Sequence, residues 1–140
     1  MRYLFISFYI ILISACVSSC KKAISIQKQQ ETVEERLNVT INPDPGSLIA
    51  VALSESFSYQ LLINSIPPKK GVSIDINVSN FLNKKIVFSQ LSQTNSNDIR
   101  NFNLEIKNLD LGILYVVKTT VTSLSDSTNK AYSTFQISRK

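Results

Sequence analysis

The sequence VSIDINVS at residues 72–79 alternates apolar and polar residues without exception. In a β-strand, successive side chains point to opposite faces, so this pattern directs every second residue into a core and the others into water. An α-helix of the same residues would spread its apolar side chains around the whole circumference. The segment therefore predicts a strand in a sheet that has one buried face and one wet face.

The same alternation recurs along most of the chain after residue 36. We expect alternating strands at residues 37–42, 57–63, 72–79, 84–91, 102–107, 113–123 and 131–138. The run at 48–53 is apolar throughout, which predicts one more short strand, buried on both faces. Turn-forming residues separate these segments, as in NPDPGS, IPPKKG and LSDSTNK. Seven or eight short strands predict an all-β, antiparallel sandwich over residues 37–140.

Composition narrows the chemistry that such a domain can perform. The chain has no His, which removes the usual general base at neutral pH and the commonest metal ligand. The serines lack the Gly-x-Ser-x-Gly setting of a hydrolase nucleophile. A glycosidase needs two carboxylates, for which the candidates are Asp75, Asp98, Glu105 and Asp110. Asp75 and Glu105 fall on polar faces of predicted strands, where carboxylates are ordinarily solvated, so we expect neither an enzyme nor a metal or cofactor site.

Both cysteines lie in the sequence LISACVSSCKK at the end of an apolar leader. Met1 and Arg2 give a positive start, residues 3–13 are apolar apart from one serine, and small residues follow, which is the order of a secretory signal. A membrane-spanning helix prefers about 20 apolar residues, so an uncleaved anchor is the less favoured alternative. A Cys16–Cys20 disulfide would constrain nothing in the domain, and a metal pair would lack further ligands.

The leader resembles that of bacterial lipoproteins, in which an apolar residue, two small residues and a Cys form a lipobox. Two registers match, ending at Cys16 and at Cys20. We prefer Cys20, because it leaves the longer apolar region and is followed by two lysines; Cys16 is the alternative. The resemblance implies a signal peptide at 1–19 and a Cys that carries diacylglycerol and an acyl chain such as palmitate. Several acyl chains anchor a protein firmly, whereas a single chain binds only marginally.

Residues 20–36 then form a lipidated start and a polar tether with little to bury. In the lipoproteins that the leader resembles, the residues after the Cys influence sorting. Lys21 differs from the Asp that signals inner-membrane retention, and the acidic residues that mark surface export are missing directly after the Cys. We therefore expect an outer-membrane anchor with the domain facing the periplasm, and the cell surface as the alternative location.

The sequence LDLGILYVVKTTV at 109–121 carries a second resemblance. Leu109, Gly112 and Tyr115 match the Leu-x-x-Gly-x-x-Tyr spacing at the E–F corner of fibronectin type III domains. The resemblance implies an immunoglobulin-like sandwich in which the Tyr115 hydroxyl bonds back to the backbone at the corner. It also implies that alternate residues from Tyr115 to Val121 enter the core. The chain departs from the family in having no Trp, which such domains commonly carry in an early strand.

Together these features predict a membrane-anchored envelope lipoprotein whose sandwich is a non-catalytic protein-interaction module. Its expected partners are the membrane, through the lipid, and another envelope protein, bound by a sheet face or edge. The alternative is a glycan surface that uses Tyr59 and Tyr132, although a core position for Tyr59 and cross-strand pairing for Tyr132 are preferred. Nucleic acid is not an expected partner of an exported chain. The pairs Lys69–Lys70 and Lys84–Lys85 would form a basic end only if their turns lie together.

Overall fold

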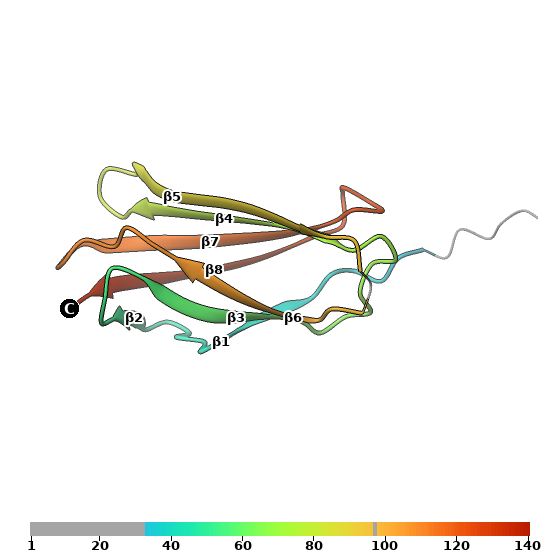
Figure 1. Cartoon of the computed structure of the whole chain (residues 1–140), viewed down its shortest axis with the longest axis horizontal. Coiled ribbons are helices and arrows are strands. Elements are labelled where there is room, and N and C mark those ends of the chain that lie inside the picture. Colours follow the sequence, from blue (N-terminus) through green and yellow to red (C-terminus); the bar gives the residue numbers. More distant parts are fainter. Residues whose placement is uncertain (1–32, 97) are drawn as a thin grey trace, which may run out of the picture. The chain divides into compact units, whose positions relative to one another are not determined.

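The computed structural model describes residues 33–96 and 98–140, which form one compact unit, Val33–Lys140. This part of the chain contains no helix, and its eight strands form two sheets. The sheets lie over one another and enclose the core (Figure 1). The prediction of an all-β sandwich with seven or eight strands is therefore confirmed.

The two sheets differ in size. The strands are β1 (Val39–Asn42), β2 (Ile49–Ala52), β3 (Phe57–Ile63), β4 (Val72–Asn80), β5 (Ile86–Thr94), β6 (Asn101–Ile106), β7 (Leu114–Ser123) and β8 (Lys130–Arg139). One sheet has the order β1-β3-β6 and the other β2-β8-β7-β4-β5. Every named pair is antiparallel except β2 with β8, which is parallel. The exception arises because the chain crosses between the sheets from β1 to β2 without reversing direction (Figure 1).

The prediction that the strand at 48–53 is buried on both faces is wrong. The strand exists as β2, but of its residues only Ala52 is buried, while Ile49 and Val51 are exposed. The reason is position: β2 lies at the margin of the five-stranded sheet, and its outer face meets solvent. A continuous apolar run does not distinguish a central strand from an edge strand that carries apolar residues on both faces. The strand predicted at 84–91 is observed further along, at Ile86–Thr94.

The core lies between the inner faces of the two sheets. On β4 the alternation is complete, with Val72, Ile74, Ile76 and Val78 all buried. On β7 the inward residues are Tyr115, Val117, Thr119 and Val121, and each is at most 1% exposed. The three-stranded sheet contributes Ile41, Tyr59, Leu61, Ile63, Leu104 and Ile106. Burying a Val, Leu, Ile or Phe side chain contributes about 1.5–3 kcal/mol, so these faces supply the main driving force for folding.

A polar contact inside the core joins the two sheets. The hydroxyl of Tyr59 on β3 lies 2.8 Å from the hydroxyl of Thr119 on β7. The ring of Tyr59 packs edge-on against Phe135, with centroids 5.4 Å apart. Burial raises the pKa of Tyr59, so its hydroxyl stays neutral and keeps a proton to donate. Tyr59 is therefore a core residue, as preferred from the sequence.

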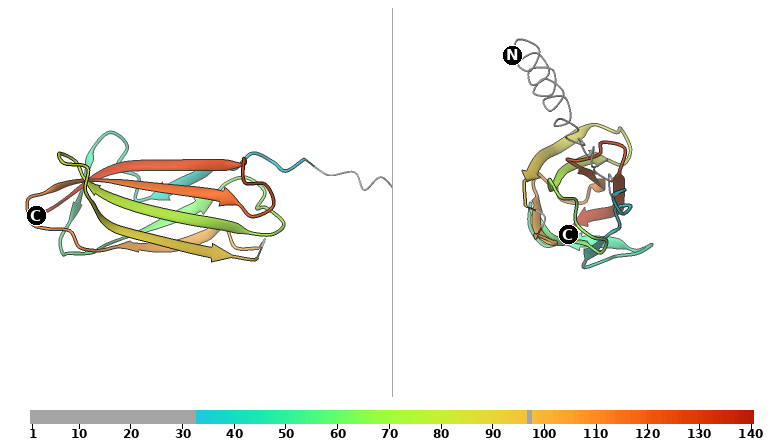
Figure 2. Two further views of the ribbon diagram at one scale, coloured as in Figure 1. Left: turned by 90° about the horizontal axis from the view of Figure 1, so that it is seen from above. Right: turned by 90° about the vertical axis from the view of Figure 1, so that its right-hand side faces the viewer.

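The strands run lengthwise between two ends of the unit (Figures 1 and 2). The entry end holds Val33 and the turns at 64–71 and 124–129, and the far end holds the turns at 53–56, 81–85 and 107–113. Lys69–Lys70 and Lys84–Lys85 flank β4 at opposite ends. The turns that carry these pairs do not lie together, and the two pairs do not form a single basic end.

Asn129 attaches the chain where it enters the unit. Its side-chain oxygen accepts from the Leu37 N–H at 2.8 Å, and its amide nitrogen donates to Glu34 and to the Glu35 carbonyl. The Glu35 carboxylate also accepts from the Ile66 N–H at 2.8 Å. The contacts of the domain therefore extend into the last residues of the predicted tether.

Candidate functional site

The outer face of the five-stranded sheet carries the side chains that alternate with the core residues. The strand register aligns them in rows across the sheet. The two rows nearest the far end are Val51–Ser138–Leu114 and Ile49–Gln136–Val116–Ser79–Ile86. The rows toward the entry end are Thr134–Lys118–Asn77–Ser89, Tyr132–Thr120–Asp75–Leu91 and Lys130–Thr122–Ser73–Gln93. The first two rows contain no ionisable side chain, whereas each of the other three contains at least one.

The two far rows and the adjoining Leu48 expose aliphatic side chains to solvent. We call Leu48, Ile49, Val51, Ile86, Leu114 and Val116 the far-half patch. Leu48 is 74% exposed, Ile86 57%, Ile49 49% and Val51 40%, while Leu114 and Val116 are half-buried. Only small or uncharged polar residues, such as Ser79 and Gln136, lie between them in the rows. Grouped exposed apolar side chains on a folded domain mark an interaction site more often than scattered ones do.

The segment between β1 and β2 forms a turn beside this patch. Asp44 accepts a hydrogen bond from the Gly46 N–H at 2.8 Å, and the Leu48 N–H donates to the Pro45 carbonyl at 2.9 Å. Gly46 has φ 56°, a left-handed conformation that glycine adopts without strain. The resulting turn borders a hollow of about 250 Å³, lined by Gly46, Ser47, Leu48, Val116, Thr134, Phe135 and Gln136. Leu48 and Val116 are the two aliphatic residues that line it.

Apart from the exposed Leu91 and Tyr132, the entry half of the same face is polar, and two pairs of its side chains contact each other. Asn77 donates a hydrogen bond to Asp75 at 3.0 Å. The ammonium of Lys118 lies 5.5 Å from the centroid of the Tyr132 ring, a cation–π distance. Tyr132 is exposed, as preferred from the sequence, but Lys118 covers part of the ring face on which a sugar would stack. The proposed partner of Tyr132 in a sugar-binding surface, Tyr59, is in the core.

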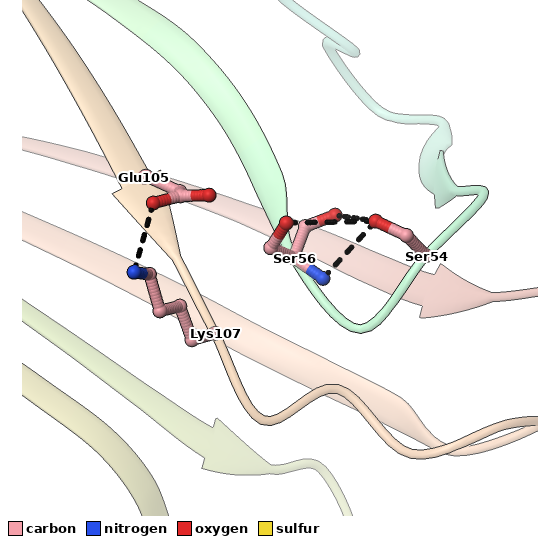
Figure 3. A network of polar contacts seen from close by, with 4 residues as sticks. All are labelled: Ser54, Ser56, Glu105 and Lys107. Atoms are coloured by element: carbon pink, nitrogen blue, oxygen red, sulfur yellow. Dashed lines mark hydrogen bonds and ion pairs between the residues drawn. The ribbon is translucent and has the colours of Figure 1, made fainter.

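The structure separates the four candidate carboxylates of the hydrolase hypothesis. Asp75 is on β4 in the five-stranded sheet and Glu105 on β6 in the three-stranded sheet, both among outward positions. Glu105 forms an ion pair of 3.1 Å with Lys107 on the surface, near the hydrogen-bonded Ser54 and Ser56 of the adjoining turn (Figure 3). Asp110 follows β6 at the far end. The fourth candidate, Asp98, lies in the connection from β5 to β6 at the other end of β6.

The predicted corner residues lie together where β6 connects to β7. The Tyr115 hydroxyl accepts from the Asp110 backbone N–H at 3.1 Å and donates to the Asp110 carboxylate at 3.0 Å. Leu109 is buried, and its carbonyl accepts from the Arg139 guanidinium at 3.1 Å. Gly112 has φ 69° and donates to the Arg139 carbonyl. Burial raises the pKa of Tyr115, which favours the neutral hydroxyl that both hydrogen bonds require.

Cys16 and Cys20 lie outside the described residues, as do the predicted signal peptide and most of the predicted tether. Within 33–96 and 98–140, no group of three or more Cys, Asp or Glu side chains is arranged to hold a metal ion. None of the described residues forms a helix that is long and apolar enough to cross a membrane.

Sequence reasoning missed the far-half patch, although β7 carried a signal for it. Residues 113–117 read ILYVV, a continuous apolar run, whereas residues 118–123 read KTTVTS, in which Val121 is the one apolar residue. The run predicts apolar residues on both faces at the start of the strand. The period-two pattern assigns Leu114 and Val116 to the outer face, because they alternate with the inward residues.

Comparisons with known proteins leave the family open. No protein-family model matches the chain, and no curated protein is significantly similar to it in sequence.

Proposed function

We propose that this chain is a lipid-anchored protein of the bacterial envelope whose sandwich binds another envelope protein through the far-half patch. The observation that carries the proposal is the contrast along one sheet face, where two neighbouring rows expose aliphatic side chains and no charge. Leaving these side chains in water costs about 25 cal/mol for each Å² of apolar surface, so covering them favours association with a partner.

The place of the patch suits a tethered domain. Val33 lies at the entry end, and the far-half patch lies toward the opposite end of the strands. A lipid anchor on Cys20, with Cys16 as the alternative, would attach upstream of Val33. The far-half patch would then lie at the end of the domain opposite to the one that the predicted tether enters. The sorting residues after Cys20 favour the outer membrane with the domain facing the periplasm, and the cell surface is the alternative.

We also assign the sandwich to the immunoglobulin-like class, as a relative of fibronectin type III domains. The corner supports this assignment, because Tyr115, near the start of β7, bonds back to the Asp110 backbone five residues upstream. The division of the strands between a three-stranded and a five-stranded sheet also agrees with such a domain. The missing Trp remains the departure from the family pattern.

A protein partner fits the geometry better than a glycan does. Sugar recognition would use the ring of Tyr132 and the amide and carboxylate of Asn77 and Asp75. Lys118 lies over the ring, and Asn77 is hydrogen-bonded to Asp75, so these groups already have partners within the chain. The far-half patch instead offers aliphatic contacts, which distinguish protein interfaces from sugar sites.

The anchor is tested by feeding a labelled fatty acid to a Gram-negative host that expresses the full chain with a C-terminal tag. We expect label in the wild type and in Cys16→Ser, and none in Cys20→Ser. Loss of label only in Cys16→Ser would move the site to the alternative register. Label in both variants, or in none of the three proteins, would contradict the anchor.

The docking surface is tested by affinity purification of the full chain from crosslinked envelope extracts. Ile49→Ser with Val51→Ser removes exposed aliphatic groups, and Thr120→Ser with Thr122→Ser is the matched change in the entry half. We expect one partner protein at the same stoichiometry with wild type and control, and at least a tenfold loss with the far-half variant. Recovery of no specific partner, or equal recovery with both variants, would contradict the proposal.

A further inference from the structure

The two edges of the five-stranded sheet are protected to different degrees. β2 is four residues long and follows two prolines, Pro43 and Pro45. β5 is nine residues long, and its sequence IVFSQLSQT contains neither a charge nor a proline. Natural edge strands are commonly shortened, charged, bulged or interrupted by proline, because an exposed edge pairs with other strands. On β5 only the bulge beside Val87 provides such protection.

The bulge confines the open part of this edge to residues 88–94. The register shifts between the pairs Val78↔Phe88 and Ser79↔Ile86, which leaves Val87 as the extra residue. The Val87 carbonyl accepts a hydrogen bond from the Asn108 side chain at 3.2 Å, so the start of the strand is occupied from the same chain. Beyond it, Phe88 to Thr94 pair regularly with β4.

The hydrogen-bond alternation shows which backbone groups of β5 point away from the sheet. The Asn80 N–H donates to the Lys85 carbonyl, toward β5, and the Phe81 N–H donates to the Leu114 carbonyl, toward β7. The backbone N–H and C=O groups of the even-numbered residues of β4 therefore point toward β5. The register places Phe88, Gln90, Ser92 and Thr94 opposite these residues, so their backbone groups point toward β4. The N–H and C=O groups of Ser89, Leu91 and Gln93 consequently point to the open edge.

We propose that this edge pairs antiparallel with the same edge of a second copy, about a two-fold axis at Leu91. Leu91 is the middle residue of the regular segment 88–94 and is 64% exposed. With the axis there, Leu91 lies opposite Leu91 of the copy, and Ser89 lies opposite Gln93. All three are edge-pointing residues, so the pair forms about six backbone hydrogen bonds in the ordinary antiparallel pattern. The result is one continuous sheet across two chains.

A second copy suits this edge better than an unrelated strand. Residues 88–94 carry no ionisable side chain, so a two-fold arrangement brings no like charges face to face, despite the basic balance of the chain. The two Leu91 side chains cover each other on the outer face, which removes an exposed leucine from water in both copies. The paired segment 88–94 contains no residue of the far-half patch, because Ile86 lies before the bulge. The pairing is therefore independent of the proposed docking.

The pairing is tested by disulfide trapping in the full chain, with the wild type as control for Cys16 and Cys20. Cα atoms of directly opposite residues in such a pair are about 5.5 Å apart, within the range of a disulfide. We expect Leu91→Cys to give a covalent dimer on mild oxidation, and Ser89→Cys to give none, because Ser89 lies opposite Gln93. The double variant Ser89→Cys with Gln93→Cys should form the dimer again.

The non-covalent dimer is measured by analytical ultracentrifugation of the full chain in detergent. We expect the dimer fraction to rise with concentration, and Leu91→Lys to raise the dimer dissociation constant at least tenfold while circular dichroism shows a folded domain. A wild-type chain that stays monomeric would overturn the proposal. So would a dimer indifferent to Leu91→Lys, or equal trapping of Ser89→Cys and Leu91→Cys.

Discussion

Val116 and Val117 are neighbours on β7, yet they point to opposite faces of the same sheet. Val117 is fully buried in the core, whereas Val116 is half-buried in the far-half patch beside the hollow. The two residues are of the same type and adjacent on one strand, so they differ only in what covers each side chain. The inner valine is covered by the second sheet, and the outer valine is left for solvent or a partner. The comparison separates apolar residues that hold the fold from those that are open to binding.

The largest effect that the comparison predicts is the difference between Val117→Ala and Val116→Ala. Val117→Ala removes buried methyl groups and leaves a cavity, so we expect a loss of about 2 kcal/mol in the free energy of unfolding. Val116 is only half-buried, so Val116→Ala should cost about half as much, roughly 1 kcal/mol or less. Urea unfolding of the two variants measures both values. Equal losses would show that the outer residue is also part of the fold.

The next effect concerns the polar contact within the inner face. Tyr59→Phe leaves the Thr119 hydroxyl buried without its partner at 2.8 Å, which should cost about 1–2 kcal/mol. Adding Thr119→Val removes the orphaned hydroxyl and should restore part of the loss. A double-mutant cycle from thermal unfolding measures the coupling. Additive losses would mean that the two hydroxyls do not stabilise each other.

A smaller effect is expected at the corner. Tyr115→Phe keeps the buried ring but removes both hydrogen bonds to Asp110, so we expect a loss of about 1 kcal/mol. Because the substitution leaves the far-half patch unchanged, crosslinking to the envelope partner should be unchanged in the folded variant. Unfolding in urea, together with the crosslinking assay, distinguishes these outcomes. A free energy of unfolding equal to that of the wild type would contradict a stabilising role for the hydrogen bonds at the corner.

The smallest effect lies in the turn at 124–129 of the entry end, away from both valines. The Thr128 hydroxyl, and next its backbone N–H, donate to the Asp126 carboxylate and hold its pKa below the ordinary value of 3.8. A lowered folded-state pKa stabilises the fold above pH 3.8, and this contribution is lost as the pH falls through the folded pKa. We expect Asp126→Asn to flatten slightly the acid limb of the stability curve. An NMR titration of the Asp126 carboxyl that shows an unshifted or raised pKa would contradict the assignment.

The two faces also differ in how well the sequence predicts them. Strict alternation in residues 72–79 predicts β4 and its buried side, because period two has a single geometric meaning in a sheet. The apolar run at 48–53 predicts a strand but not its place, since burial depends on which strand lies beside it. The order of the strands, which puts β2 at one edge and β5 at the other, depends on contacts between segments far apart in the sequence. The far-half patch depends on that order as well: the run at 113–117 indicates apolar residues on both faces of β7, but not which strands lie beside them.

The most direct test of a docking surface confined to one half of the face is a photo-crosslinking scan along β7. A photoreactive residue is placed in turn at Leu114, Val116, Thr120 and Thr122, which share the outer face of one strand. In the full chain, within intact cells, we predict one discrete adduct from Leu114 and Val116 and none from Thr120 and Thr122. Adducts of equal yield at all four positions, or none at Leu114 and Val116, would contradict the account.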